Sequence, residues 1–204
     1  MSEHRSAPDT PAPGNAVPAA DEARRGWLAL GTLPVVAAVL VALNGLYILL
    51  VAFGNITDFG TNQAFVQHVL AMDTTNFGAP AGEDLDPDVM WRAITDPVLQ
   101  NVAYIGLIAW ESATAIVLVA AVVFWIRERH HGYRTARAIS TIGLLMLIAL
   151  FMGGFITIGG EWFQMWKSTS WNGLDPAFNN SVLALIALVL IHLPSLHWTA
   201  RDRA

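Results

Sequence analysis

The chain has 204 residues, of which 54% are hydrophobic and 13% are charged, and its formal net charge is −5. This composition is too apolar for an average soluble domain and is typical of a membrane protein. The absence of Cys excludes disulfides, thiolate metal sites, iron–sulfur clusters and Cys nucleophiles. No basic groove is indicated, so we expect no nucleic-acid partner.

The first 25 residues are polar and rich in Pro and Ala, and we expect a disordered cytoplasmic tail because they cannot bury enough apolar surface to fold. Residues 27–53 form the first predicted membrane span. Pro34 lies in its first third, where a proline can kink a helix. Asn44 and Tyr47 are three residues apart and share a helix face. We expect them to hydrogen-bond neighbouring helices, the alternative being contact with Glu111.

A long outer segment follows at residues 54–96. Within it, residues 61–72 have helical spacing, with Phe65 and Val69 on one side. This stretch is too short to span a bilayer, so it predicts a helix lying at the membrane interface. A second, shorter helical piece is expected after Pro87, carrying Met90, Trp91 and Arg92.

The second predicted span, residues 98–126, carries a single charge, Glu111, near its middle. An acid at that depth costs about 2.5–3.5 kcal/mol on insertion scales. Glu111 is therefore expected to face other helices and to be either protonated or paired. It is a candidate proton or cation site, the alternative being a structural acid bonded to polar neighbours.

The third and fourth predicted spans cover residues 139–158 and 181–193. Glycines at 143, 153 and 154 are expected to allow close helix approach. Gly159 and Gly160 are expected to break the third helix and to begin a second outer segment, residues 159–180. The sequence thus predicts an all-α membrane protein with four transmembrane helices, short interfacial helices forming an outer cap, and a short end at 199–204.

The orientation follows from the distribution of Lys and Arg. The cations on one side of the predicted spans are Arg5, Arg24 and Arg25 before the first span, Arg127, Arg129, Arg134 and Arg137 between the second and third, and Arg201 and Arg203 after the fourth. Only Arg92 and Lys167 lie on the other side. Because cytoplasmic loops are enriched in cations, both termini are predicted to be cytoplasmic.

The outer segments hold a dense set of polar and aromatic side chains that can line a pocket or a partner surface. They are Asn55, Asp58, His68, Asp73, Trp91, Arg92, Glu161, Trp162, Trp166, Lys167, Trp171 and Asn172. Arg92 and Glu161 are expected to pair across this pocket or surface. The alternative is an interfacial cap, in which Trp side chains anchor and the polar groups satisfy one another.

No cofactor or metal is expected. His68 and His192 fall on opposite membrane faces in this topology, so they cannot ligate one haem iron together. His130, His131 and His197 lie at the inner surface and are interpreted as a solvated cluster, the alternative being that they gather a metal. No nucleophile–base pair, P-loop or HExxH pattern is present, so the sequence offers no basis for an enzyme assignment.

Four motifs, in order, resemble the DUF2165 family. They are NITDFGTNQAFVQHVLAMDTT at 55–75, MWRAITDP at 90–97, AWESAT at 109–114 and GGEWFQMWKSTSWNG at 159–173. The resemblance covers about residues 27–196 and implies a small, multi-pass protein of the bacterial cytoplasmic membrane. It implies no activity and no catalytic residues.

Three functions stay open on the sequence. The favoured one is an accessory or interaction subunit of a larger membrane assembly, with the lipid bilayer and other membrane-protein subunits as partners. The second is a small transporter or a proton or cation conduit that uses Glu111. The third is a lipid-binding protein or an enzyme with its site in the outer cap, formed by His68, Asp73, Arg92 and Glu161.

Overall fold

The computed structural model describes residues 30–198, and this part of the chain is helical without strands. The long helices are α2 (Leu33–Thr57), α4 (Pro97–Arg127), α5 (Arg134–Ile148) continued by η3 (Ala149–Trp162), and α6 (Leu174–His192). Four helical segments are long and apolar enough to cross a bilayer, which confirms the predicted fold class. The predicted tail at 1–25 lies outside the described residues.

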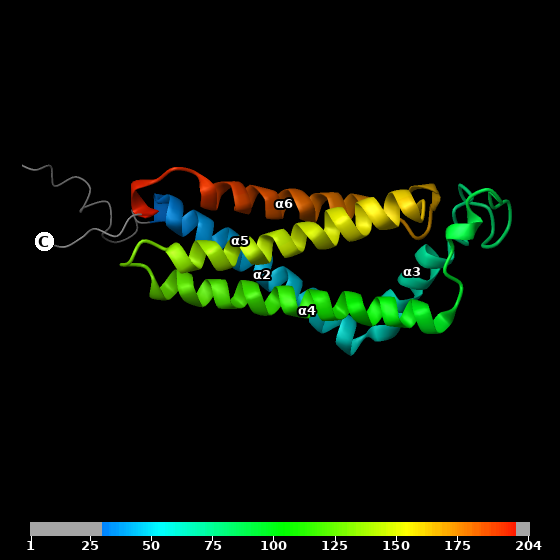
Figure 1. Cartoon of the computed structure of the whole chain (residues 1–204), viewed down its shortest axis with the longest axis horizontal. Coiled ribbons are helices and arrows are strands. Elements are labelled where there is room, and N and C mark those ends of the chain that lie inside the picture. The colour runs from blue at the N-terminus through cyan, green and yellow to red at the C-terminus, as the bar shows by residue number, and fades with distance from the viewer. Residues whose placement is uncertain (1–29, 199–204) are drawn as a thin grey trace, which may run out of the picture.

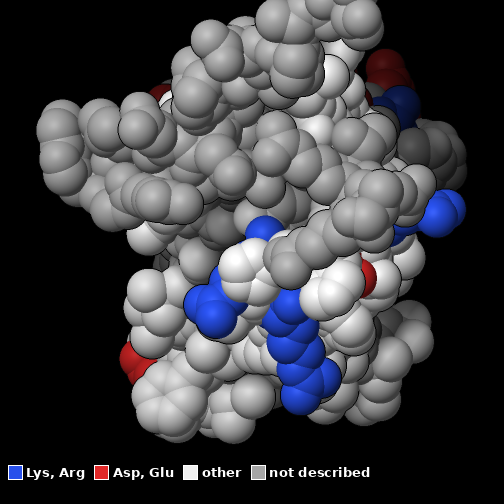
Figure 2. Space-filling view, turned by 90° about the vertical axis from the view of Figure 1, so that its left-hand side faces the viewer, with Lys and Arg blue, Asp and Glu red and all other residues white. Residues whose placement is uncertain are grey.

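The described chain begins and ends at the same end of an elongated bundle, here called the termini end, and the opposite end is called the cap end (Figure 1). The connection between α4 and α5 also lies at the termini end. It carries Arg127, Arg129 and Arg134, and Figure 2 shows Arg side chains gathered on this face. At the other end of the bundle, α3 (Phe59–Ala71) and the loop that follows it form the cap together with the segment that precedes α6.

The first span begins later and ends later than predicted. In the described chain, α2 starts at Leu33, so Pro34 lies in its first turn and does not kink the helix interior. The helix continues to Thr57 and therefore brings Asn55 into the bundle. The second span agrees closely with its prediction, and the Asp96 side chain caps it by accepting hydrogen bonds from the backbone N–H groups of Val98 and Leu99.

The third span is longer than predicted at both ends. It starts at Arg134 because the Glu128 carboxylate accepts hydrogen bonds from the backbone N–H groups of the first turn, at 3.0 Å from both Thr135 and Ala136. At the other end, the helix does not break at Gly159 and Gly160. It continues to Trp162 as a π-helix.

The π-helix η3 has hydrogen bonds between residues five apart, as shown by the 3.0 Å bond from the Phe163 N–H to the Ile158 carbonyl. Such wide turns are uncommon and usually occur as short interruptions, often near functional sites. The glycines here permit close approach instead of ending the helix. A Cβ on Gly160 would lie 2.9 Å from Leu174 Cδ2, and one on Gly159 would lie 3.4 Å from Met165 Cε.

The fourth span begins at Leu174, seven positions before the prediction. The Asn172 side chain accepts a hydrogen bond from the Leu174 N–H at 3.1 Å, and Pro176 lies in the first turn, where its missing donor is not needed. Asn180 lies within α6, and its side chain donates a hydrogen bond of 2.7 Å to the Tyr47 hydroxyl on α2.

The predicted short helices of the cap are present. Residues 61–72 fall largely within α3, and a single helical turn covers Met90–Arg92. A bend at Asp58 separates α3 from α2, and α3 then runs toward the cap end between the diverging outer halves of α4 and η3 (Figure 1). No residue of α3 is fully buried.

Leu118 is the central packing residue of the bundle and is completely buried. Two glycines make room for it: a Cβ on Gly45 of α2 would lie 3.1 Å from Leu118 Cβ, and one on Gly143 of α5 would lie 2.5 Å from Leu118 Cδ2. The prediction of close helix approach is therefore confirmed at Gly143. The same prediction is wrong at Gly153 and Gly154, where an added Cβ would meet no neighbouring helix.

We expect Gly143→Ala to lower the free energy of unfolding by about 1–3 kcal/mol, because Leu118 is confined from both sides and cannot yield. Gly106→Ala on α4 is the matched control, since an added Cβ there meets nothing within 4 Å. That control should be neutral or stabilising by up to about 1 kcal/mol. Equilibrium unfolding in a mild detergent measures both, and equal effects would contradict the packing described.

Candidate functional site

Glu111 lies inside the bundle, and its carboxylate is held by an amide. The side chain is 3% exposed, and its Oε2 accepts a hydrogen bond of 2.7 Å from Asn55 Nδ2. The Asn55 carbonyl oxygen in turn accepts a 2.6 Å bond from Asn62 Nδ2 on α3. This chain, the Glu111–Asn55–Asn62 relay, joins α4, α2 and α3 and leads from the bundle interior toward the cap end.

Tyr104 lies two turns from Glu111 on the same face of α4 and is 1% exposed. Its ring packs against Phe59 at 4.6 Å, and its hydroxyl has no hydrogen-bond partner among the described residues. On the termini side of Glu111, the core is largely apolar and includes Leu118, Ala121 and Val41, each 0% exposed. The buried hydroxyls there, those of Thr114 and Ser140, donate to carbonyls of their own helices and so do not extend the relay in that direction.

The two polar residues singled out in the first span have different roles. Tyr47 accepts a hydrogen bond of 2.7 Å from Asn180 on α6, as expected for a group that links neighbouring helices. For Asn44 both expectations are wrong. Its amide donates to the Leu40 carbonyl of its own helix at 2.9 Å, so it contacts neither a neighbouring helix by hydrogen bond nor Glu111.

His68 and Asp73 form a pair that secures the chain reversal after α3. His68 Nδ1 lies 2.9 Å from both carboxylate oxygens of Asp73, and the imidazole stacks on Trp171 with ring centroids 4.6 Å apart. Between them, Met72 adopts a left-handed backbone with φ 54°. Both side chains are about a third exposed, so solvent largely screens any electrostatic attraction between them. The role of the Asp73 carboxylate is to orient the His68 imidazole ring.

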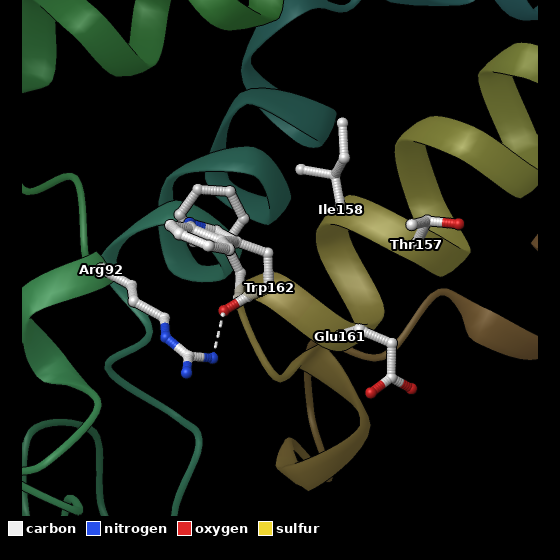
Figure 3. A pocket seen from close by; sticks show the side chains of 6 residues that line it. Arg92, Thr157, Ile158, Glu161 and Trp162 are labelled. Carbon is white, nitrogen blue, oxygen red and sulfur yellow. Dashed lines mark hydrogen bonds between the residues drawn. The ribbon is translucent and has the colours of Figure 1, made fainter.

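An open hollow of about 600 Å³ lies at the cap end beside Arg92 (Figure 3). The guanidinium lies 5.5 Å from the Trp91 ring centroid and 5.3 Å from that of Trp162, and its Nη1 donates to the Trp162 carbonyl at 3.4 Å. Its buried Nε has no partner among the described residues. Glu161 lines the opposite wall of this hollow. The predicted ion pair between Arg92 and Glu161 is not among the ion pairs of the described residues, so that prediction is wrong.

A second hollow, narrower and apolar, adjoins the first. It has a volume of about 140 Å³ and lies between α3, α4 and η3. Its lining includes Phe65, Val66, Val69, Leu70, Ala103, Leu107, Phe155 and Met165. Ile158 and Phe163 line both hollows, so the two are neighbours. We call these two neighbouring hollows together the amphipathic cleft. Arg92 and Glu161 line the first hollow, here called its mouth, and hydrocarbon side chains line the second.

The remaining cap candidates have local roles. Asp58 accepts a hydrogen bond from the Thr61 hydroxyl at 2.8 Å, next to the bend between α2 and α3. Trp166 packs edge-on against Phe77 at 5.8 Å, and the Asn172 side chain accepts a hydrogen bond from the first backbone N–H of α6. No cluster of three or more His, Asp or Glu suited to a metal ion occurs among residues 30–198.

Sequence reasoning missed three features of the site: Asn62 as the third member of the relay, the buried Tyr104 hydroxyl, and the apolar hollow. Only the Tyr104 hydroxyl carried a usable signal, because Tyr104 and Glu111 are seven residues apart on one helix. That spacing returns to the same face after two helical turns. Asn62 carried none, because the bend at Asp58 separates it from the helix of Asn55. The hollow carried no such signal, because it depends on how far α4 and η3 diverge.

The fold and this site define an integral membrane protein with four helical spans and an amphipathic cleft at one end of the bundle. The chain belongs to the DUF2165 family, described as predicted small integral membrane proteins, which matches residues 33–194. No curated protein and no solved structure matched the chain.

A double-mutant cycle tests the Glu111–Asn55 hydrogen bond. Asn55→Ala leaves a buried carboxyl without its partner, so we expect a loss of about 1–3 kcal/mol in the free energy of unfolding. The loss should shrink by at least about 1 kcal/mol when Glu111→Ala is already present. Asn44→Ala is the matched control and should show no coupling with Glu111→Ala, since the Asn44 amide donates to its own helix and not to Glu111. Equal coupling in both cycles would refute the assignment.

Proposed function

We propose that this membrane protein binds a phospholipid in its amphipathic cleft, with the phosphate at Arg92 and part of one acyl chain between α3, α4 and η3. The observation that carries the proposal is the adjacency of the two hollows, which share Ile158 and Phe163. With both termini in the cytoplasm, the site would face the outer leaflet.

Arg92 suits a phosphate for geometric and electrostatic reasons. Guanidinium carries five N–H donors in a planar fork that matches phosphate oxygens, and its charge persists at any physiological pH. Only one of these donors has a partner among the described residues, at 3.4 Å. Cation–π contacts with Trp91 and Trp162, at 5.5 and 5.3 Å from the ring centroids, hold the guanidinium in place, so little side-chain entropy would be lost on binding.

The apolar hollow suits a hydrocarbon chain. Phe65, Val66, Val69 and Leu70 present the apolar side of α3 to it, yet each remains only partly buried. Partly covered side chains around an unfilled volume lack packing partners, which an acyl chain would supply. The hollow at Arg92 adds a polar end to the same cleft, as expected for an amphiphile.

Among the functions left open by the sequence, lipid binding has the most specific support. A conduit through Glu111 would need a polar path to both ends of the bundle. On its termini side the core is largely apolar, and the buried hydroxyls of Thr114 and Ser140 donate to carbonyls of their own helices. An assembly subunit would need a surface matched to a partner. A co-purifying membrane protein that occludes the cleft would favour that role over lipid binding.

We expect Arg92→Ala to reduce the occupancy of retained phospholipid by about 10-fold or more, because a hydrogen-bonded charge pair contributes about 1.5–3 kcal/mol. Native mass spectrometry of protein extracted in mild detergent measures the retained lipid. Lys167→Ala is the control: this other cap-end cation lies over Phe77 and Trp166 and lines neither hollow. Undiminished lipid in Arg92→Ala would contradict the proposal.

A second variant tests the chain-binding part of the cleft without touching any charge. Ala103→Trp should fill the apolar hollow and displace the lipid, since Ala103 lines it. Ala109→Trp on the same helix is the matched control, because Ala109 is exposed and lines neither hollow. Equal lipid retention in the two variants, at unchanged thermal stability, would show that the hollow holds no acyl chain.

A further inference from the structure

The mouth of the cleft carries two opposite charges that do not neutralise each other. Arg92 lies on the wall formed by the short Met90–Arg92 helix, and Glu161 lies on the wall formed by η3 (Figure 3). Both line the same hollow of about 600 Å³, and no ion pair joins them. Opposite charges held apart across an open volume complement a ligand that itself carries both signs.

We infer that the cleft selects a phospholipid whose headgroup combines a phosphate with a primary ammonium group. This inference rests on the proposed lipid binding and specifies its ligand. The phosphate would accept hydrogen bonds from Arg92, and the ammonium would donate to the Glu161 carboxylate. The hollow supplies the space between the two groups, and the acyl chain enters the apolar hollow past Ile158 and Phe163.

The position of the Arg92 hollow along the membrane normal agrees with the level of the lipid headgroups. Trp91 is 70% exposed and Trp162 is 47% exposed, and both flank Arg92. Exposed Trp side chains at the end of a membrane bundle mark the level of the lipid headgroups. The polar part of the cleft is therefore at the interface, while its apolar part extends toward the hydrocarbon region between α4 and η3.

The Glu161 carboxylate distinguishes a headgroup with a primary ammonium from other headgroups. A primary ammonium has three N–H donors for a carboxylate, whereas a quaternary ammonium has none. Quaternary ammonium groups are recognised instead by aromatic faces. The nearest such faces, those of Trp91 and Trp162, lie against the Arg92 guanidinium. An uncharged glycerol headgroup would leave the Glu161 carboxylate facing the lipid phosphate without a cation between them.

The experiment compares lipid classes with identical acyl chains. Wild-type protein is incubated with mixed vesicles containing equal amounts of phosphatidylethanolamine, phosphatidylcholine and phosphatidylglycerol, and native mass spectrometry then measures the lipid retained. We expect phosphatidylethanolamine to be enriched about threefold to fivefold over each of the others, the range expected for one exposed charge pair.

Glu161→Gln should abolish this enrichment while leaving the total lipid retained nearly unchanged. Glu83→Gln, an exposed acid of the cap that lines neither hollow, should leave the enrichment intact. Equal retention of the three classes by wild-type protein, or an unchanged ratio in Glu161→Gln, would overturn the headgroup assignment but keep lipid binding. No retained lipid in any variant would refute the proposed function and the headgroup assignment together.

Discussion

The hydrogen bond between Asn55 and Glu111 is the constraint on which the rest of the architecture depends. A carboxyl group within a bilayer is costly to bury, and the cost falls when a polar partner replaces water. That requirement fixes the crossing of α2 against α4, since Asn55 must reach Glu111 at 2.7 Å. The second bond from Asn62 then ties α3 back to the same point after the bend at Asp58.

Anchoring α3 in this way leaves its apolar face without a complete packing partner. The helix is tethered near its start by Asn62 and near its end by the His68–Asp73 pair. Between these points its apolar residues face the space where α4 and η3 diverge (Figure 1). The wide π turns of η3 and its close contacts at Gly159 and Gly160 shape the other wall. The amphipathic cleft is thus a consequence of how the buried acid is satisfied.

The division of charge along the molecule is consistent with a lipid-binding role. The termini end collects Arg side chains near the α4–α5 connection, as the positive-inside rule predicts for a cytoplasmic face (Figure 2). The cap end has few cations, and Arg92 is the one held between aromatic rings beside a hollow. A single oriented guanidinium next to an apolar cleft favours one bound lipid over diffuse attraction to a charged surface.

The sequence by itself determined the class, the number of spans and the short cap helices, because hydropathy and cap signals are local properties of the chain. It also singled out Glu111, Arg92 and Glu161 as chemically notable. Tertiary structure decided their partners: Asn55 rather than Asn44 meets Glu111, and Arg92 contacts Trp162 rather than Glu161. Those pairings depend on the rotation of each helix and on the bend at Asp58. Many rotations bury the same apolar area, so hydropathy cannot choose among them.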